Sequence, residues 1–278
     1  MGDRAHVRCM VVRSPEVTMN DLAWGRRRMR QRIAQHGALS PEAHAALAWL
    51  PAELRTLRPH AYLIREGRRP ASCSMLLSGV ACRHKLTGDG ARQIVGIYLK
   101  GDFVDAQNLF LDRSDHNIQA ISDCEVLDVP IDAMRRLVAD QPEIARALWS
   151  ETLVEAAMMR EWLLNLGRRD AAVRVIHLLC ELAVRLQHLG LAGHDNFQLP
   201  LTQAQLADAV GLTAVHVNRV LRQLELRGLI ARDHRCVRVM DWQALRQAGD
   251  FSPAYLHLGE TRAAAARGAR IARAYADG

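Results

Sequence analysis

The chain has no apolar run near the ~20 residues that a membrane-spanning helix needs. Its first residues also lack the apolar core and the cleavage site of a secretory signal. The six cysteines are scattered and include no CxxC pair, unlike the dense disulfide framework of a small secreted protein. We therefore expect a cytoplasmic protein with reduced thiols and without a membrane partner.

The sequence also lacks the common catalytic motifs. None of HExxH, GxSxG, GxxxxGKS/T or GxGxxG is present, although the chain has 12 histidines and 30 acidic residues. This absence argues against an enzyme. A length of 278 residues allows two modest hydrophobic cores. The net charge of +7 weakly favours a polyanionic partner.

The stretch from residue 201 to 230 has the residue pattern of a helix-turn-helix. Ala207 is small where the two helices must cross closely, and Gly211 has the backbone freedom that the turn requires. Thr213 is placed to cap the second helix. An apolar stripe then packs this helix on its domain: Val217, Val220, Leu221 and Leu224. An ordinary helical hairpin in a globular core is the alternative interpretation.

The opposite face of the second helix is polar and basic. Arg219 is suited to a bidentate contact with guanine O6 and N7, and His216 and Asn218 to a base edge or a phosphate. The candidate DNA-binding residues are Thr202, Gln203, Thr213, Val215, His216, Asn218, Arg219 and Arg222. After Gly228, two short apolar runs flank Asp233 to Arg235 and predict a β-hairpin. Together these features predict a winged helix-turn-helix that binds double-stranded DNA.

From Leu57 to about Val129, short strand patterns alternate with turns. Glu66-Gly67, Ser78-Gly79 and Thr87 to Gly90 divide apolar runs at even spacing. Such spacing predicts a β-roll or jelly roll. A roll that acts as a dimer scaffold, without any effector, is the alternative to a sensor domain.

The helix-turn-helix, together with the pieces REG, LLSG and TGDGARQIVGIYLKGDF, resembles the CRP/FNR family of bacterial transcription regulators. The resemblance implies an effector domain with the cyclic-nucleotide-binding fold, and RNA polymerase as a protein partner. It also implies that Arg219 reads a guanine in each half-site. Val215 stands where well-known members have a base-reading glutamate, so it is interpreted as a contact to a thymine methyl. We expect an operator that differs from the best-known one.

In nucleotide-binding members, the segment after Gly-Asp/Glu-Phe holds a cyclic phosphate with an Arg-Ser pair. The corresponding candidate effector pocket here comprises Gly101, Asp102, Phe103, Asp105, Arg113 and Ser114. Asp105 and Asp115 would repel a phosphate. The sequence therefore argues against cyclic AMP as the effector.

The cysteines and histidines argue against two further cofactors, heme and an iron-sulfur cluster. Cys82 and His84 lie two apart on a predicted strand and so share a face, but the pair lies one strand away from the family's heme position. Oxygen-sensing members of the resembled family hold an iron-sulfur cluster with closely spaced cysteines near the N-terminus plus one further along, and here that early region has only Cys9. We expect no metal site, no heme and no iron-sulfur cluster.

A long helix is predicted from Pro142 to Leu166. The coiled-coil seam follows steps of three and four residues: Trp149, Thr152, Ala156, Met159, Leu163 and Leu166. This pattern favours a homodimer, because two recognition helices about 34 Å apart can read a near-palindrome. A single helix that lies on the β-roll is the alternative. Residues 167–170 break the pattern and are interpreted as a hinge through which the β-roll sets the spacing of the recognition helices.

The fold class that follows is α+β. Five segments are predicted: a basic, disordered extension (1–38), a cyclic-nucleotide-binding-like β-roll (39–140), a dimerisation helix (141–167), a winged helix-turn-helix (168–258) and an Ala- and Arg-rich tail (259–278). The predicted function is sequence-specific transcription regulation, with an unidentified small-molecule effector or none. The alternative is a ligand, redox or heme sensor that binds nucleic acid without sequence preference. Replacing Arg219 by alanine discriminates between the two functions. A sequence-specific regulator would lose its preference for particular bases, whereas a non-specific binder would bind all sequences more weakly to the same degree.

Overall fold

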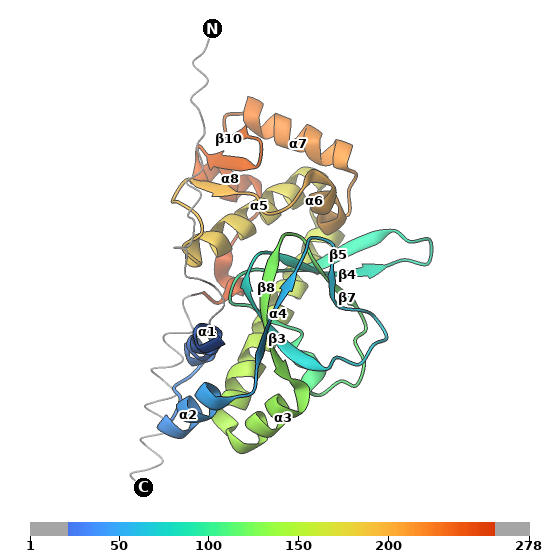
Figure 1. Ribbon diagram of the computed structural model, residues 1–278. Coiled ribbons are helices and arrows are strands. Elements are labelled where there is room, and N and C mark those ends of the chain that lie inside the picture. The colour runs from blue at the N-terminus through green and yellow to red at the C-terminus, as the bar shows by residue number, and fades with distance from the viewer. Residues whose placement is uncertain (1–21, 259–278) are drawn as a thin grey trace. The chain divides into compact units, whose positions relative to one another are not determined.

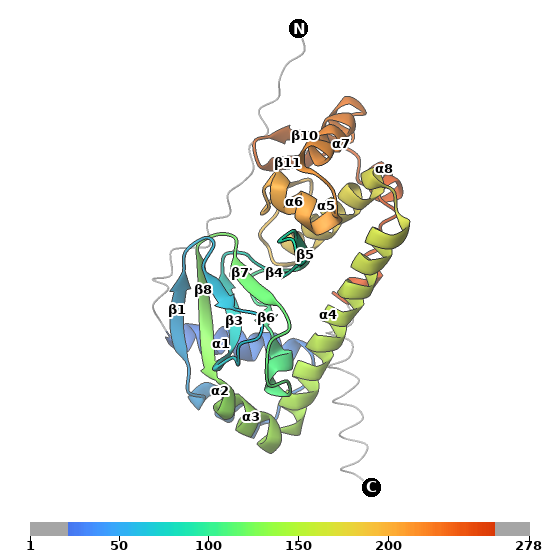
Figure 2. The ribbon, with the colours of Figure 1, turned by 90° about the vertical axis from the view of Figure 1, so that its right-hand side faces the viewer.

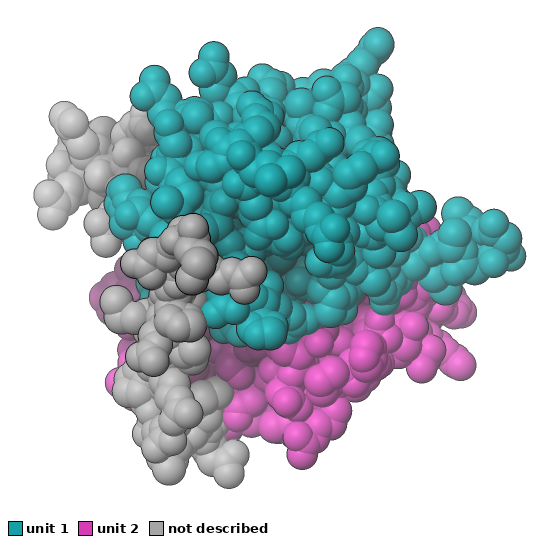
Figure 3. All heavy atoms as spheres, turned by 90° about the horizontal axis from the view of Figure 1, so that it is seen from above, with its two compact units in different colours: residues 1–16, 86–95, 159–255 teal, residues 17–85, 96–158, 256–278 magenta. Residues whose placement is uncertain are grey.

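The computed structural model describes residues 22–258. Contacts among these residues define two compact units, which are coloured separately in Figure 3. Unit 1 contains residues 86–95 and 159–255, and unit 2 contains residues 22–85, 96–158 and 256–258. The predicted tail at 259–278 and the first 21 residues of the predicted extension lie outside the described residues.

We call residues 22–158 the effector region. Strands fill its middle, from Glu53 to Pro130, as the alternation of apolar runs and turns predicts. They are β1 (Glu53–Leu57), β2 (Tyr62–Ile64), β3 (Ser72–Ser78), β4 (Ala81–Leu86), β5 (Arg92–Tyr98), β6 (Phe103–Val104), β7 (Asn117–Ala120) and β8 (Cys124–Pro130). Two four-stranded sheets form, with the orders β1-β8-β3-β6 and β2-β7-β4-β5. The pairing of β8 with both β1 and β3 is antiparallel. The predicted β-roll is confirmed, and with the helices it confirms the α+β class.

Four helices complete the effector region: α1 (Leu22–Gln35), α2 (Pro41–Trp49), α3 (Ile131–Asp140) and the first part of α4 (Pro142–Arg168), with a short 3-10 turn η1 (Ala106–Leu109). Ser40 caps α2 by accepting from the Ala43 backbone N–H. Figure 2 shows α1 lying across the sheet of β1, β8 and β3.

The prediction of a disordered extension as far as residue 38 is wrong for residues 22–35, which form α1. Met29 and Ile33 of this helix are almost fully buried in the core with Leu47 and Met134. The arginines on the other faces of α1 obscured this narrow apolar stripe in the sequence. Burial of two large apolar side chains, at roughly 1.5–3 kcal/mol each, is enough to hold the helix on the sheet.

A buried ion-pair group also fastens α1 to α4. The Glu151 carboxylate lies 2.5 Å from Arg32 Nη2 and also pairs with His36 Nε2. Burial by itself would raise the pKa of Glu151, but Arg32 and His36 lower it from 4.5 to about 2. The folded state therefore prefers the charged carboxylate more strongly than the unfolded state does.

We expect this carboxylate to make the stability of the protein depend on acid pH. Because the folded pKa is lowered, the stabilisation is complete above pH 4.5 and is lost as the pH falls toward 2. Glu151→Gln should lower the free energy of unfolding at pH 7 by about 3 kcal/mol and flatten the dependence below pH 4.5. Urea unfolding from pH 3 to 7 measures both, with the exposed Glu53→Gln as control. An unchanged pH dependence in Glu151→Gln would contradict the assignment.

Unit 1 is a three-stranded sheet with helices packed on it. Its elements after α4 are α5 (Ala171–His188), β9 (Asn196–Gln198), α6 (Gln203–Val210), α7 (Ala214–Leu226), β10 (Ile230–Asp233), β11 (Cys236–Val239), α8 (Trp242–Ala248) and a 3-10 turn η2 (Pro253–Leu256). The strand order is β10-β11-β9, and both pairings are antiparallel. The hairpin of β10 and β11 confirms the predicted wing, and α5 packs on α6, α7 and α8.

The long helix α4 confirms the predicted helix, but it continues through Gly167 to Arg168. The chain therefore leaves the helix at Arg169, and Asp170 then caps α5 by accepting from the Val173 backbone N–H. The Arg169 side chain is largely buried and pairs with Glu161 at 2.7 Å and with Asp250 at 2.9 Å. Ion pairs thus hold the segment that was predicted as a hinge.

Four of the cysteines are free and buried: Cys73, Cys82, Cys124 and Cys180. Burial raises the pKa of Cys73 and of Cys180 to about 12, so these thiols stay protonated and unreactive. Cys236 in β11 is disulfide-bonded, so the expectation of reduced thiols throughout the chain is wrong at this residue. No helix within residues 22–258 is long and apolar enough to cross a membrane.

Candidate nucleic-acid interface and effector site

The two helices of the predicted helix-turn-helix are α6 and α7. Thr202 opens α6 with a capping box, in which its hydroxyl accepts from the Gln205 N–H and the Gln205 side chain accepts from the Thr202 N–H. Gly211 ends α6 with a φ of 65°, a left-handed conformation that favours glycine. Thr213 then caps α7 by accepting from the His216 N–H at 3.2 Å. Gly211 and Thr213 therefore have the structural roles that the sequence predicts, whereas the cap at Thr202 was not predicted.

Helix α7 has one buried and one exposed face. The predicted apolar stripe is buried, with all four side chains at most 2% exposed: Val217, Val220, Leu221 and Leu224. Arg219 and Arg222 lie on the exposed face, and Val215 is 81% exposed. In Figure 1, α7 lies at the edge of unit 1 with β10 beside it. An exposed basic helix face preceded by a tight turn can enter the major groove of DNA.

Two hydrogen bonds order the polar side chains on this face. Arg219 Nη2 lies 3.1 Å from His216 Nε2, and Asn218 Nδ2 donates to Gln203 Oε1 at 3.1 Å. The second bond joins α7 to the start of α6. Both contacts join residues on the predicted list, but the pairing itself was missed because it depends on side-chain geometry.

The wing is held to α7 by charge. Arg232 of β10 makes two hydrogen bonds to the Glu225 carboxylate of α7, at 3.0 and 2.8 Å. Such a fork geometry fixes orientation as well as adding stability. Because Glu225 is the one acidic residue of α7, its pairing leaves the exposed face with basic groups.

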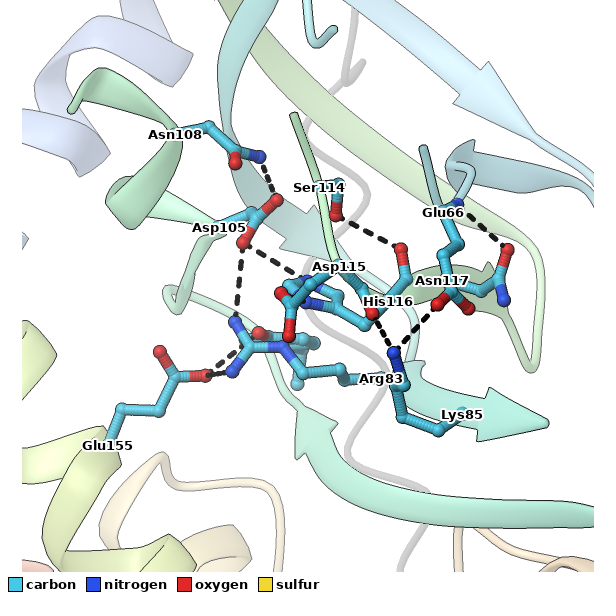
Figure 4. Close-up of polar contacts among 11 residues, drawn as sticks. Glu66, Arg83, Lys85, Asp105, Asn108, Ser114, Asp115, His116, Asn117 and Glu155 are labelled. Atoms are coloured by element: carbon cyan, nitrogen blue, oxygen red, sulfur yellow. Dashed lines mark hydrogen bonds and ion pairs between the residues drawn. The ribbon is translucent and has the colours of Figure 1, made fainter. Parts of the chain in front are cut away.

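The structure separates the residues of the predicted effector pocket. Asp102 accepts from the Leu99 backbone N–H at 2.8 Å, and Arg113 is exposed and donates to the Gly67 carbonyl at 2.9 Å. Phe103 is buried in the core, and Gly101 forms a turn with a φ of 94°. Asp105 and Ser114 alone lie in a common buried polar group (Figure 4).

The centre of this group is Asp105, which is 2% exposed and has a positive φ of 65°. Its carboxylate pairs with Arg83 Nη2 at 3.5 Å and with His116 Nε2 at 3.1 Å, and it accepts from the Asn108 amide. Arg83 Nη1 also reaches Glu155 of α4 at 3.0 Å. Figure 4 shows Arg83 between the two carboxylates. We call these residues, Arg83, Asp105, His116 and Glu155, the roll cluster.

The roll cluster contains its own counterions. Burial by itself would lower the pKa of Arg83, but Tyr98, Glu155 and Asp105 raise it, so the guanidinium stays charged. Tyr98 donates to the same Glu155 carboxylate at 2.8 Å. An incoming phosphate would find the arginine already paired and would meet two carboxylates. The geometry therefore disfavours an anionic ligand at this place.

Removing the arginine should destabilise the protein, because two carboxylates would lose their buried counterion. We expect Arg83→Ala to lower the free energy of unfolding by about 3 kcal/mol, the usual cost of breaking a buried ion pair. Arg113→Ala, which removes an exposed arginine, should change it by about 0.5 kcal/mol or less. Urea denaturation followed by circular dichroism measures the difference. Equal stability of the two variants would show that the roll cluster contributes nothing.

The Cys-x-His pair, which the sequence argues against as heme ligands, is buried. Cys82 and His84 are each 1% exposed, and the His84 ring lies 6.0 Å from the ring of Tyr62. Within residues 22–258, no group of three or more His, Cys, Asp or Glu side chains is arranged to hold a metal ion. The residue between them, Arg83, is the one that enters the roll cluster.

Comparisons with known proteins agree with both halves of this description. A family model for the cyclic nucleotide-binding domain matches residues 54–141, and one for the Crp-like helix-turn-helix domain matches residues 173–248. A probable transcriptional activator of Rhizobium leguminosarum is 34% identical over 168 residues, which are 60% of this chain and 69% of that protein. The transcriptional activator FnrL of Cereibacter sphaeroides is 31% identical over 195 residues, 68% of this chain and 78% of that protein.

Among solved structures, FixK2 from Bradyrhizobium japonicum is similar to the chain. It has a TM-score of 0.67 and 26% sequence identity, and the match covers 73% of this chain and all of that one. The similarity therefore extends over the whole length of that solved chain.

Proposed function

The chain belongs to the CRP/FNR family of DNA-binding transcription regulators, and from this premise we propose that it reads a near-palindromic operator as a homodimer. The family consists of regulators and not of enzymes. The observation that carries the proposal is the exposed basic face of α7 around Arg219. A dimer has two such faces related by a two-fold axis, which matches the symmetry of a near-palindromic operator.

Each residue of the interface has a proposed role. Arg219 makes the bidentate contact to guanine, and the exposed methyl groups of Val215 contact a thymine methyl. His216 orients Arg219 through the hydrogen bond between them, and Asn218 orients Gln203 in the same way. The remaining candidates contact phosphates: Thr202, Gln203, Thr213 and Arg222.

The proposed dimer forms along the seam of α4. Trp149, Met159 and Leu163 on the seam are 60%, 44% and 72% exposed in the single chain. Large apolar side chains in a row at coiled-coil spacing are stabilised when a second helix covers them. Homodimers are typical of the family.

We propose that the roll cluster takes the place of an anionic effector. Arg83 joins Asp105 of the roll to Glu155 of α4, so an internal ion pair connects these elements without a ligand. On this view the protein binds neither cyclic AMP, heme nor an iron-sulfur cluster. Isothermal titration with cyclic AMP should show no binding at micromolar concentrations, and a micromolar dissociation constant would refute the proposal.

RNA polymerase is the proposed partner in transcription.

A competition experiment tests the proposed function as a whole. Labelled duplex that has been selected from a random pool is bound by the full chain, and unlabelled duplex of unrelated sequence is added in excess. A sequence-specific regulator keeps the selected duplex under this competition. Equal displacement by the unrelated duplex would favour binding without sequence preference.

A further inference from the structure

An apolar groove lies beside the first half of α4 in unit 2. It has a volume of about 480 Å³. Its walls come from η1 and the residues after it, from α3 and from α4. Leu109 and Leu148 form buried parts of the wall, and Phe110, Leu111 and Trp149 are 73%, 51% and 60% exposed. The described surface therefore presents three large apolar side chains around one apolar hollow.

This groove is continuous with the seam of α4, because Trp149 and Thr152 belong to both. The Thr152 hydroxyl donates to the Leu148 carbonyl of its own helix at 3.0 Å and so adds little polarity to the wall. A small molecule in the groove would leave much of Phe110, Trp149 and the neighbouring Leu153 in water. A helix from a second copy would cover all three. The pattern of exposure thus favours a second copy as the occupant.

The spacing on α4 indicates which side chain enters. With Trp149 and Thr152 as the first and fourth positions of a heptad, Leu148 precedes the first and Leu153 follows the fourth. In heptad notation, Trp149 and Thr152 are positions a and d, Leu148 is position g of the preceding heptad, and Leu153 is position e. In a parallel two-stranded coiled coil, each g position faces the e position that lies five residues later in the partner helix. Leu148 on the groove wall therefore faces Leu153 of a second copy. Leu153 is 50% exposed in the single chain and is free to pack in this way.

We propose that the dimer interface extends beyond the α4 seam, and that Leu153 of each copy packs into the groove beside Phe110 and Leu111 of the other. The interface is then isologous, so the groove is filled twice in each dimer. This inference rests on the proposed dimeric regulator and adds the effector region to its interface. Because η1 follows Asp105 of the roll cluster, one short segment contributes both to that cluster and to the dimer contact.

Cross-linking between two differently tagged copies tests the proposal. One full-length copy carries Leu111→Cys and the other Leu153→Cys, and the mixture is treated with a short bismaleimide. We expect the heterodimer product to exceed the product of either variant alone by about tenfold or more, because proximity raises the effective concentration of the thiols. The single variants also measure any background from the native cysteines.

Two further measurements separate the possible failures. Leu163→Cys on the seam should cross-link to itself in any parallel α4 dimer. Cross-linking at Leu163 without the Leu111–Leu153 product would overturn the groove contact and leave the dimer intact. A monomer in sedimentation, without either product, would overturn both.

An equilibrium measurement adds a second check on the same contact. Leu111→Ser should raise the dimer dissociation constant by about tenfold or more, as expected for the lost burial of a leucine. Leu226→Ser removes a leucine that is 87% exposed at the end of α7 and should leave this constant unchanged. Equal dissociation constants for the two variants would contradict the proposal.

Discussion

Replacing Arg219 by alanine is expected to weaken binding to the selected operator by about 100-fold or more. Each good bidentate contact to a guanine provides roughly 1–3 kcal/mol of discrimination, and a dimer makes it in both half-sites. The guanidinium is exposed on α7 and lies 3.1 Å from His216 Nε2, so its removal takes nothing from the core of the domain. The loss should therefore appear in DNA binding and not in stability. Fluorescence anisotropy on operator and unrelated duplexes measures it.

Arg222→Ala is the matched control for this prediction. Arg222 lies on the same exposed face three residues later, where we propose a phosphate contact. Its loss should weaken binding to every sequence equally and reduce the salt dependence by about two ions, one for each half-site. If Arg219→Ala also weakened all duplexes equally, Arg219 would be a phosphate contact, and the assignment of base reading to it would be wrong.

A charge in the α4 seam should have a still larger effect. Leu163→Asp is expected to convert the dimer to a monomer, because two carboxylates would face each other in an apolar seam. A monomer reads one half-site, so we expect operator affinity to fall by about 1,000-fold or more. Leu163 is 72% exposed in the single chain, so the folded monomer tolerates the change. Sedimentation velocity and anisotropy measure the two consequences.

Leu164→Asp supplies the control from the adjacent position of the same helix. Leu164 is 45% exposed but lies beside the seam and not on it. We expect this variant to remain dimeric and to bind the operator. Dissociation of both variants would show that α4 has no specific seam, and a dimeric Leu163→Asp would place the interface elsewhere.

The helix-turn-helix was predictable because its signals are local. Thr213 caps the helix that it precedes, and Gly211 takes the left-handed conformation that the turn requires. Burial of Val217 and Val220 follows from helical periodicity alone. In such a segment each residue interacts with residues only a few positions away in the sequence. The sequence alone is therefore sufficient to predict the structure of the segment.

The roll cluster was not predictable, because its members are far apart in the sequence. Arg83, Asp105 and Glu155 come from β4, the start of η1 and α4. The sequence draws attention instead to Arg113 and Ser114, which are adjacent, but Arg113 is exposed and bonded to Gly67. Long-range pairing of buried charges depends on the register of strands and on helix packing, neither of which leaves a local pattern.

The error at α1 has a different cause. Arginine-rich segments are usually solvated, and this composition outweighed the short stripe formed by Met29 and Ile33. Tertiary contacts determine whether α1 folds onto the domain, because Glu151 of α4 forms the ion pair with Arg32. The charge of α1 therefore stabilises its packing.

Selection of duplexes from a random pool by the full chain tests the central claim most directly, and the same selection is repeated with Arg219→Ala. The account predicts a near-palindromic motif with half-site centres about 10 base pairs apart. It also predicts that the alanine variant loses the preference for guanine at one symmetric pair of positions. A pool without any symmetric motif, or the same guanine preference in both selections, would contradict it.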